Sequence, residues 1–237
     1  MSDKPSVVLK NVSVFIGPKQ VLQEINLSFE PNLVYGLVGP SGGGKSVLLK
    51  TIFGILSPSS GSIQLNGIRN LTIQFQEGGL FDFLTVADNL AVQILGLKKT
   101  LRELSGNERK AFFEEVYSAA GFLNLIDSLF KYPHELSGGM KKRTLIGRAI
   151  LSKPELIAFD DPIAGLDPIN SRIVVNKIFE IIKTSRPITL ISFHNLRFFR
   201  DLVDVLIFID QGKVYAFGKM DDVLSETRVR NFFKYRL

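Results

Sequence analysis

The chain has 237 residues, of which 45% are hydrophobic and 22% charged, with a formal net charge of +6 and no cysteine. This composition suits one α/β domain with a substantial core, and it excludes disordered chains, disulfide scaffolds and cysteine-ligated metal sites. The N-terminal residues lack a signal-peptide core, and no apolar run approaches the roughly 20 residues of a membrane span. We therefore expect a soluble, cytoplasmic protein.

The opening third predicts β structure that leads into a phosphate loop. Residues 7–15 and 21–29 are β-prone, and residues 33–38 form a short apolar strand. A helix is expected over residues 46–56, and two short strands over 63–65 and 71–75 with Asn66-Gly67 as the turn between them. Between the apolar strand and the helix lies the loop Gly39, Pro40, Ser41, Gly42, Gly43, Gly44, Lys45, Ser46.

The character becomes helical from about residue 80 to residue 150, and residues 106–120 are amphipathic at helical period. Strands return at residues 156–160, 188–193 and 205–209, with helical segments between them. This alternation predicts a parallel sheet built from βαβ units, with a mostly helical insertion after the phosphate loop.

The phosphate loop and a pair of acids carry the expected chemistry. Glycines let backbone N–H groups converge on phosphate oxygens, and the following helix adds the positive end of its dipole. Lys45 is predicted to reach the β- and γ-phosphates and Ser46 to hold Mg²⁺. Asp160 ends an apolar strand at the carboxyl edge of the sheet, where it would hold Mg²⁺ mostly through water. Asp161 would lie nearer the γ-phosphate and polarise the attacking water.

Ser137, Gly138 and Gly139 supply a second phosphate-binding arrangement, because they combine bare amides, a hydroxyl and a helix N-terminus. One triphosphate held by residues 39–46 hardly needs two such sites from one chain. We therefore expect each chain to offer the second one to the nucleotide of a partner. This predicts a homodimer with two nucleotide sites between the copies.

These elements, in this order and over essentially the whole chain, resemble the ATP-binding subunit of an ABC transporter. The resemblance implies a P-loop NTPase (RecA-like) α/β core with an N-terminal antiparallel β subdomain. One domain over residues 1–237 would have 1–78 and 140–237 as this core and 79–139 as an inserted α-helical subdomain. Its implied cofactors are ATP and Mg²⁺, its reaction is ATP hydrolysis, and its partner is an integral membrane permease. It also implies that Gln76 senses Mg²⁺ and the permease, that His194 contacts the γ-phosphate, and that residues 164–167 cross between the two sites.

A finer resemblance is to the ATPases of lipid-asymmetry (Mla/Mce-type) transporters. It is carried by residues 75–82 and 84–86, Met140, residues 161–168 and residues 228–232. It implies phospholipid transport between the envelope membranes of Gram-negative bacteria, further lipid-transporter subunits, and a peripheral location on the cytoplasmic face of the inner membrane. Asp161 stands where the family usually has glutamate, so slow hydrolysis is expected. The aromatic that stacks on adenine in many relatives would fall near Ile16, beside Phe15.

Several alternatives stay open. Phe81 and Phe83 either line a groove for the permease or pack in the core. The basic C-terminal segment forms a solvated face, contacts an anionic surface, or docks as a tail. The chain could serve another cargo or be a weakly hydrolysing regulatory subunit. A nucleic-acid partner is not expected, because the insertion is too short for the coiled coils of such ATPases.

Overall fold

The computed structural model describes residues 5–76, 78–95 and 104–234 and contains a central six-stranded sheet in the order β5-β6-β7-β3-β8-β9. Neighbouring strands from β5 to β8 run parallel, and β9 joins the edge antiparallel. The bounds are β3 (Val34–Val38), β5 (Leu71–Gln74), β6 (Leu156–Asp160), β7 (Ile188–Ser192), β8 (Val205–Asp210) and β9 (Lys213–Lys219). Glu77, Tyr235 and Arg236, which belong to the motif and tail used above, lie outside the described residues.

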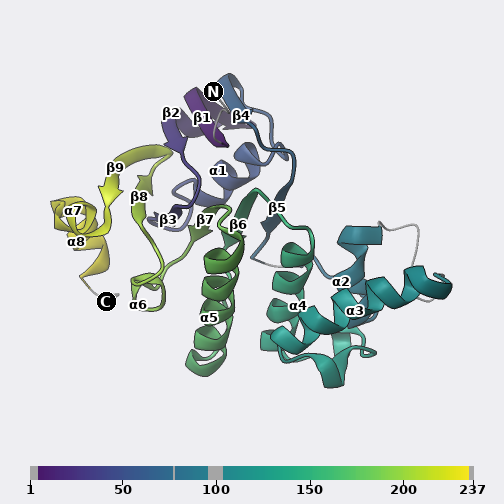
Figure 1. Ribbon diagram of the computed structural model, residues 1–237. Coiled ribbons are helices and arrows are strands. Elements are labelled where there is room, and N and C mark those ends of the chain that lie inside the picture. The colour runs from purple at the N-terminus through teal and green to yellow at the C-terminus, as the bar shows by residue number, and fades with distance from the viewer. Residues whose placement is uncertain (1–4, 77, 96–103, 235–237) are drawn as a thin grey trace.

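A smaller antiparallel sheet in the order β2-β1-β4 contains β1 (Ser6–Ile16), β2 (Lys19–Phe29) and β4 (Ser60–Asn66). Figure 1 shows it at the top of the molecule, with α1 (Lys45–Ile52) between it and the central sheet. Successive strand residues point to opposite faces. Leu156 and Ala158 therefore pack in the cluster shared with α1 and the small sheet, while Ile157 and Phe159 pack in the other.

The hydrophobic cluster that contains Ile157 and Phe159 lies on the opposite face of the central sheet, under the helices that follow the insertion. These are α4 (Gly138–Leu151), α5 (Pro168–Ser185), α6 (Leu196–Phe199), α7 (Met220–Ser225) and α8 (Thr227–Phe233). The insertion contributes α2 (Val86–Leu95) and α3 (Gly106–Phe122), with the short 3₁₀ turns η2 (Ile126–Ser128) and η3 (Pro133–Glu135). Both α2 and α3 contact α4, away from the sheet (Figure 1). The predicted α/β fold with a helical insertion is confirmed.

The predicted connection at Asn66-Gly67 is wrong as a hairpin turn. The strand before it, β4, pairs antiparallel with β1 in the small sheet, whereas β5 after it pairs parallel with β6 in the central sheet. β5 is half-buried beside the fully buried β6, so pairing there covers Leu71 and Ile73. A local turn signal was outweighed by this burial.

The C-terminal segment docks on the sheet through α8. Val229 and Phe233 are each 1% exposed, and the Phe232 ring lies 5.5 Å from that of Phe208 on β8. Arg228 donates to Asp210, and its guanidinium lies 3.8 Å from the ring centroid of Tyr215. Of the alternatives for this segment, the docked tail is the one observed as far as residue 234. In the described residues, no helix is long and apolar enough to span a bilayer.

Candidate functional site

The phosphate loop runs between β3 and α1, and its glycines fit it closely against neighbouring backbone. A Cβ on Gly39 would lie 1.9 Å from the carbonyl oxygen of Ile209, and a Cβ on Gly43 would lie 2.9 Å from the same oxygen. Gly39 also has φ 145, a conformation that side chains disfavour. Gly42 (φ 76) faces open space, since a Cβ there would have nothing within 4 Å. The loop is thus packed on one side and bare on the other, as a phosphate site requires.

Lys45 begins α1 and lies across this loop. Its side chain is 7% exposed, and Nζ donates to the carbonyl oxygens of Gly39 at 2.8 Å and Pro40 at 2.9 Å. The ammonium is therefore held beside the glycines that would receive a phosphate. Pro40 and Ser41 complete the predicted loop, and both lie at the surface or close to it.

Ser46, Gln76 and Asp160 were predicted as a magnesium site, and the structure brings them together. They line one hollow of ≈ 480 Å³, with Lys50, Ile55 and Phe75 as its other walls. A hydroxyl, an amide and a carboxylate are oxygen ligands of the kind that Mg²⁺ takes, and this ion usually adds phosphate and water oxygens. In the described part of the chain, no group of three or more His, Cys, Asp or Glu could hold a metal ion. Three oxygen donors from this chain leave coordination positions for phosphate and water oxygens, so Ser46, Gln76 and Asp160 fit a Mg²⁺ that shares its coordination with a nucleotide.

Asp160, Asp161 and His194 meet at the carboxyl edge of the sheet. Asp160 ends β6 and is 5% exposed, while Asp161 follows it in a left-handed conformation with φ 44 and is 9% exposed. His194 lies two residues beyond β7, and its Nε2 is 3.8 Å from Oδ2 of Asp161. That separation is too long for a direct hydrogen bond. No atom fits between two side chains this close, but one water or phosphate oxygen beside the pair can contact both.

Burial raises the pKa of the Asp161 carboxyl above its ordinary value. His194 opposes this rise, the neighbouring Asp160 adds to it, and the ammonium groups of Lys142 and Lys45 oppose it. A raised pKa suits a group that is to accept a proton. The sequence did not single out Lys142 for any role, because its closeness to Asp161 depends on how α4 packs.

The second phosphate-binding arrangement opens α4. The Ser137 hydroxyl caps the helix by accepting from the Met140 N–H at 3.3 Å. Gly139 is buried, and its Cβ would lie 2.5 Å from Oδ1 of Asn170 on α5, so its bareness serves helix packing. Gly138 is exposed, and the nearest atom to its Cβ would be Cδ2 of Leu166 at an ordinary 3.7 Å. Ser137, Gly138 and Gly139 do not line the hollow around Asp160.

Residues 164–167 lead from the acids into α5. Asp167 caps α5 by accepting from the N–H groups of Ile169 and Asn170, each at 3.0 Å. Ile169 in the first turn is 75% exposed. The starts of α4 and α5 therefore lie side by side, where Gly139 meets Asn170, and present exposed apolar and bare backbone surface.

The aromatic residues around the loops are mostly at the surface. Phe15 and Ile16 at the end of β1 are 50% and 51% exposed, so neither is a core residue. Phe83 is 72% exposed, which excludes core packing for it, while the half-buried Phe81 lies 5.8 Å from its ring. His134 stacks on Tyr132.

Two cationic side chains of α4 hold the loop between β5 and α2. Lys142 donates to the backbone oxygen of Gln76, and Arg148 donates to that of Gly79. The Arg148 guanidinium also lies 5.4 Å from the Phe81 ring centroid. Burial lowers the pKa of Arg148.

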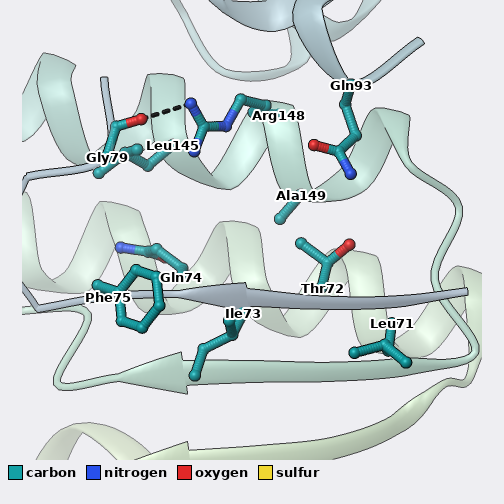
Figure 2. A pocket seen from close by; sticks show the side chains of 10 residues that line it. All are labelled: Leu71, Thr72, Ile73, Gln74, Phe75, Gly79, Gln93, Leu145, Arg148 and Ala149. Carbon is teal, nitrogen blue, oxygen red and sulfur yellow. Dashed lines mark hydrogen bonds between the residues drawn. The ribbon is translucent and has the colours of Figure 1, made fainter. Parts of the chain in front are cut away.

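A cavity of ≈ 160 Å³ lies between β5 and α4. Figure 2 shows its lining, with Arg148 hydrogen-bonded to Gly79 above Gln74. Gln74 is 3% exposed, and among the described residues neither polar atom of its amide has a hydrogen-bond partner. Gln93 of α2 reaches the same cavity from the other end. Such an unpaired buried amide lowers stability.

The chain matches known proteins over most of its length. The family described as ABC transporter matches residues 22–164. The thiamine import ATP-binding protein ThiQ of Aliivibrio fischeri is 31% identical over 90% of this chain and 92% of its own. The probable ribonucleotide transport ATP-binding protein mkl of Mycobacterium bovis is 30% identical over 98% of this chain and 67% of its own. A nucleotide-free ATP-binding cassette from an ABC transporter, 24% identical, superposes with a TM-score of 0.82 over 97% of this chain and 98% of its own.

Proposed function

The chain belongs to the ABC transporter family of ATP-binding domains, which bind ATP and couple its hydrolysis to transport, and we propose that it powers phospholipid transport between bacterial envelope membranes. Within it, residues 79–139 form the helical subdomain, and residues 1–78 and 140–237 form the core. The chain acts as a peripheral subunit on the cytoplasmic face of the inner membrane, bound to a permease.

The observation that carries the ATP-hydrolysing part of this proposal is the common edge at which the phosphate loop, Asp160, Asp161 and His194 meet. Residues 39–46 bind the phosphates, with Lys45 exchanging its loop carbonyls for phosphate oxygens. Ser46, Gln76 and Asp160 hold Mg²⁺, which neutralises charge on the phosphates when bound. Asp161 polarises the attacking water and accepts its proton, since its pKa is raised. His194, which lies beside Asp161, contacts the γ-phosphate.

Two copies of the chain complete each site. Gly138 has room for a Cβ within its own chain and has no positive φ, so neither packing nor backbone conformation within the monomer requires glycine at this position. The exposed Ile169 nearby supplies apolar surface for a contact. A partner's nucleotide at Ser137 and Gly138 accounts for both features. In a heterodimer of one Lys45→Ala chain and one Ser137→Ala chain, we expect one of the two sites to be intact, whereas dimers of either variant alone hydrolyse almost no ATP.

Hydrolysis is proposed to be slow, because Asp161 is one methylene shorter than glutamate. A misplacement of about 1 Å can cost on the order of 10²-fold in rate. Turnover of the assembled transporter with Asp161→Glu should exceed that of the wild type. A slower glutamate variant would mean that the left-handed backbone at Asp161 already places the carboxylate correctly.

The exposed ring of Phe83 and the adjoining Phe81 form the proposed docking surface for the permease. Phe83→Ala should uncouple transport and weaken co-purification with the permease, while ATP binding stays as in the wild type. Phe217 is a matched control, since it is also an exposed phenylalanine, 49% exposed, and belongs to β9, which lies on the opposite side of the molecule from α2 (Figure 1). If Phe217→Ala had the same effect, the surface would be wrongly assigned.

The lipid cargo is supported by the resemblance of residues 75–86, Met140 and 161–168 to lipid-asymmetry ATPases. The relatives carry names with different cargoes, thiamine and ribonucleotide among them. The test is reconstitution with its permease in vesicles, with fluorescent phospholipid, thiamine and a ribonucleotide offered separately. ATP-dependent movement of phospholipid alone is expected, and it should be absent with Lys45→Ala. Movement of another cargo would leave the ATPase assignment intact and overturn the lipid proposal.

A further inference from the structure

One hydroxyl group links the two acids of the site. Ser192 is the last residue of β7, is 1% exposed, and lies directly across from Asp160 in the parallel pairing of β6 with β7. Its Oγ donates to Oδ1 of Asp160 and accepts from the backbone N–H of Asp161 at 3.0 Å. No motif in the sequence points to this serine.

The direction of both hydrogen bonds is fixed by chemistry. A backbone N–H can only donate, so the hydroxyl must act as acceptor toward Asp161. A hydroxyl has one proton, and the Asp160 carboxylate can only accept when ionised. The result is an ordered chain from the Asp161 N–H through the Ser192 hydroxyl to the Asp160 carboxylate. Hydrogen bonds in such a chain polarise and strengthen one another.

The same contact holds the unusual backbone of Asp161. Left-handed φ is uncommon for a residue with a side chain, and it persists only where the surroundings determine it. Here the Asp161 N–H meets both the backbone oxygen of Ser192, at 3.1 Å, and its Oγ. The conformation leaves the Asp161 carboxylate facing His194.

We propose that Ser192 is a positioning residue for hydrolysis. It fixes the carboxylate of Asp160, which holds Mg²⁺, relative to the carboxylate of Asp161, which polarises the attacking water. This inference rests on the roles proposed above for Asp160 and Asp161. The short side chain of Asp161 makes its backbone position matter more, because it has fewer rotatable bonds than glutamate with which to compensate. Partners that orient a metal ligand typically contribute 10–100-fold to metal affinity or activity.

The variants are Ser192→Ala, which removes the link, and Ser192→Thr, which keeps a hydroxyl. Thr189→Val is the matched control, because Thr189 is a fully buried hydroxyl residue on the same strand that donates to the Pro187 carbonyl oxygen, away from the acids. For the transporter complex, the measurements are kcat and KM for ATP, the melting temperature, and the affinity of the ATP-loaded protein for Mn²⁺ by electron paramagnetic resonance.

For Ser192→Ala, kcat should fall about 10–100-fold and Mn²⁺ affinity about tenfold, with KM for ATP within roughly threefold of the wild type. Ser192→Thr should restore both quantities, and Thr189→Val should leave both unchanged even where its melting temperature falls as much. If the alanine chain does not fold, Ser192→Cys fills the site with a slightly larger thiol, which weakens both hydrogen bonds and should show the same split.

Equal small effects of Ser192→Ala and Thr189→Val on kcat and Mn²⁺ affinity would overturn the inference. A threonine variant that folds but restores neither quantity would overturn it as well. Asp160→Asn separates this failure from a failure of the site assignment. If Asp160→Asn still binds Mn²⁺, both the metal role of Asp160 and the inference about Ser192 are overturned. If Asp160→Asn loses Mn²⁺ binding but Ser192→Ala keeps it, only the inference about Ser192 is overturned.

Discussion

Two adjacent glycines at the start of α4 should respond in opposite ways to the same substitution. Alanine at Gly138 gains helix propensity of up to about 1 kcal/mol and meets only an ordinary contact, 3.7 Å from Leu166. Alanine at Gly139 gains the same propensity but places Cβ 2.5 Å from Oδ1 of Asn170. The propensity gain is common to both, so it cancels in the difference between the two variants.

What remains is the cost of displacing Asn170. Its Nδ2 donates to Oδ2 of Asp167 at 2.6 Å, and its Oδ1 accepts from Arg143, so the side chain cannot rotate away without losing these contacts. Overpacking of this kind costs about 1–3 kcal/mol. We therefore expect Gly139→Ala to be less stable than Gly138→Ala by about 1–3 kcal/mol.

Urea unfolding of the nucleotide-free chain, followed by circular dichroism, measures this difference. A gap below about 0.5 kcal/mol, well short of the overpacking range, would refute the reasoning. The same pair also tests the dimer proposal. Gly138→Ala should keep its stability but lose most ATP hydrolysis in the assembled transporter, because a methyl group there obstructs only the partner's nucleotide. Full activity of Gly138→Ala would contradict the proposal that the partner's nucleotide requires glycine at this position.

Three further substitutions test the energetics of the fold. Gln74→Met removes two unpaired buried amide atoms and should stabilise the chain by about 1 kcal/mol or more in urea unfolding; lower stability would mean that the amide is satisfied in solution. Burial raises the folded-state pKa of Asp161, so its contribution to stability is complete below the ordinary aspartate pKa and is lost as pH rises through the raised value. Asp161→Asn should therefore gain stability over the wild type as pH rises from about 3.5 to 7, measured in EDTA without nucleotide, and a constant difference would contradict this. Phe233→Ala should cost about 3–5 kcal/mol and lower the melting temperature, because the ring is 1% exposed; a loss below about 1 kcal/mol would show that α8 does not dock in solution.

Local patterns predicted the parts of the site that lie on a single segment. The phosphate loop and the acids after β6 depend on glycine spacing and on an apolar run that ends in Asp160, both of which are visible in the sequence. The parallel sheet with a mostly helical insertion followed from the alternation of such runs with helices. These features are local, so no knowledge of strand pairing was needed.

Contacts between distant segments were not predictable in this way. Ser192 meets Asp160 only because β6 and β7 pair in one particular register. The reason for glycine at position 139 is an asparagine on α5, and the hairpin expected at Asn66-Gly67 was wrong because β5 pairs with a strand far along the chain. Sequence periodicity contains no information on register between such segments.

The two bonds from α4 to the loop before α2 have a consequence for how signals pass through the molecule. Lys142 and Arg148 tie the carbonyl groups of Gln76 and Gly79 to the helix that begins at Ser137. These bonds couple the loop to the helix, because a shift of one without the other would break them. Thermodynamic reciprocity then applies: whatever factor a bound permease applies to ATP affinity, ATP must apply to the affinity for the permease. Measuring either quantity gives the other.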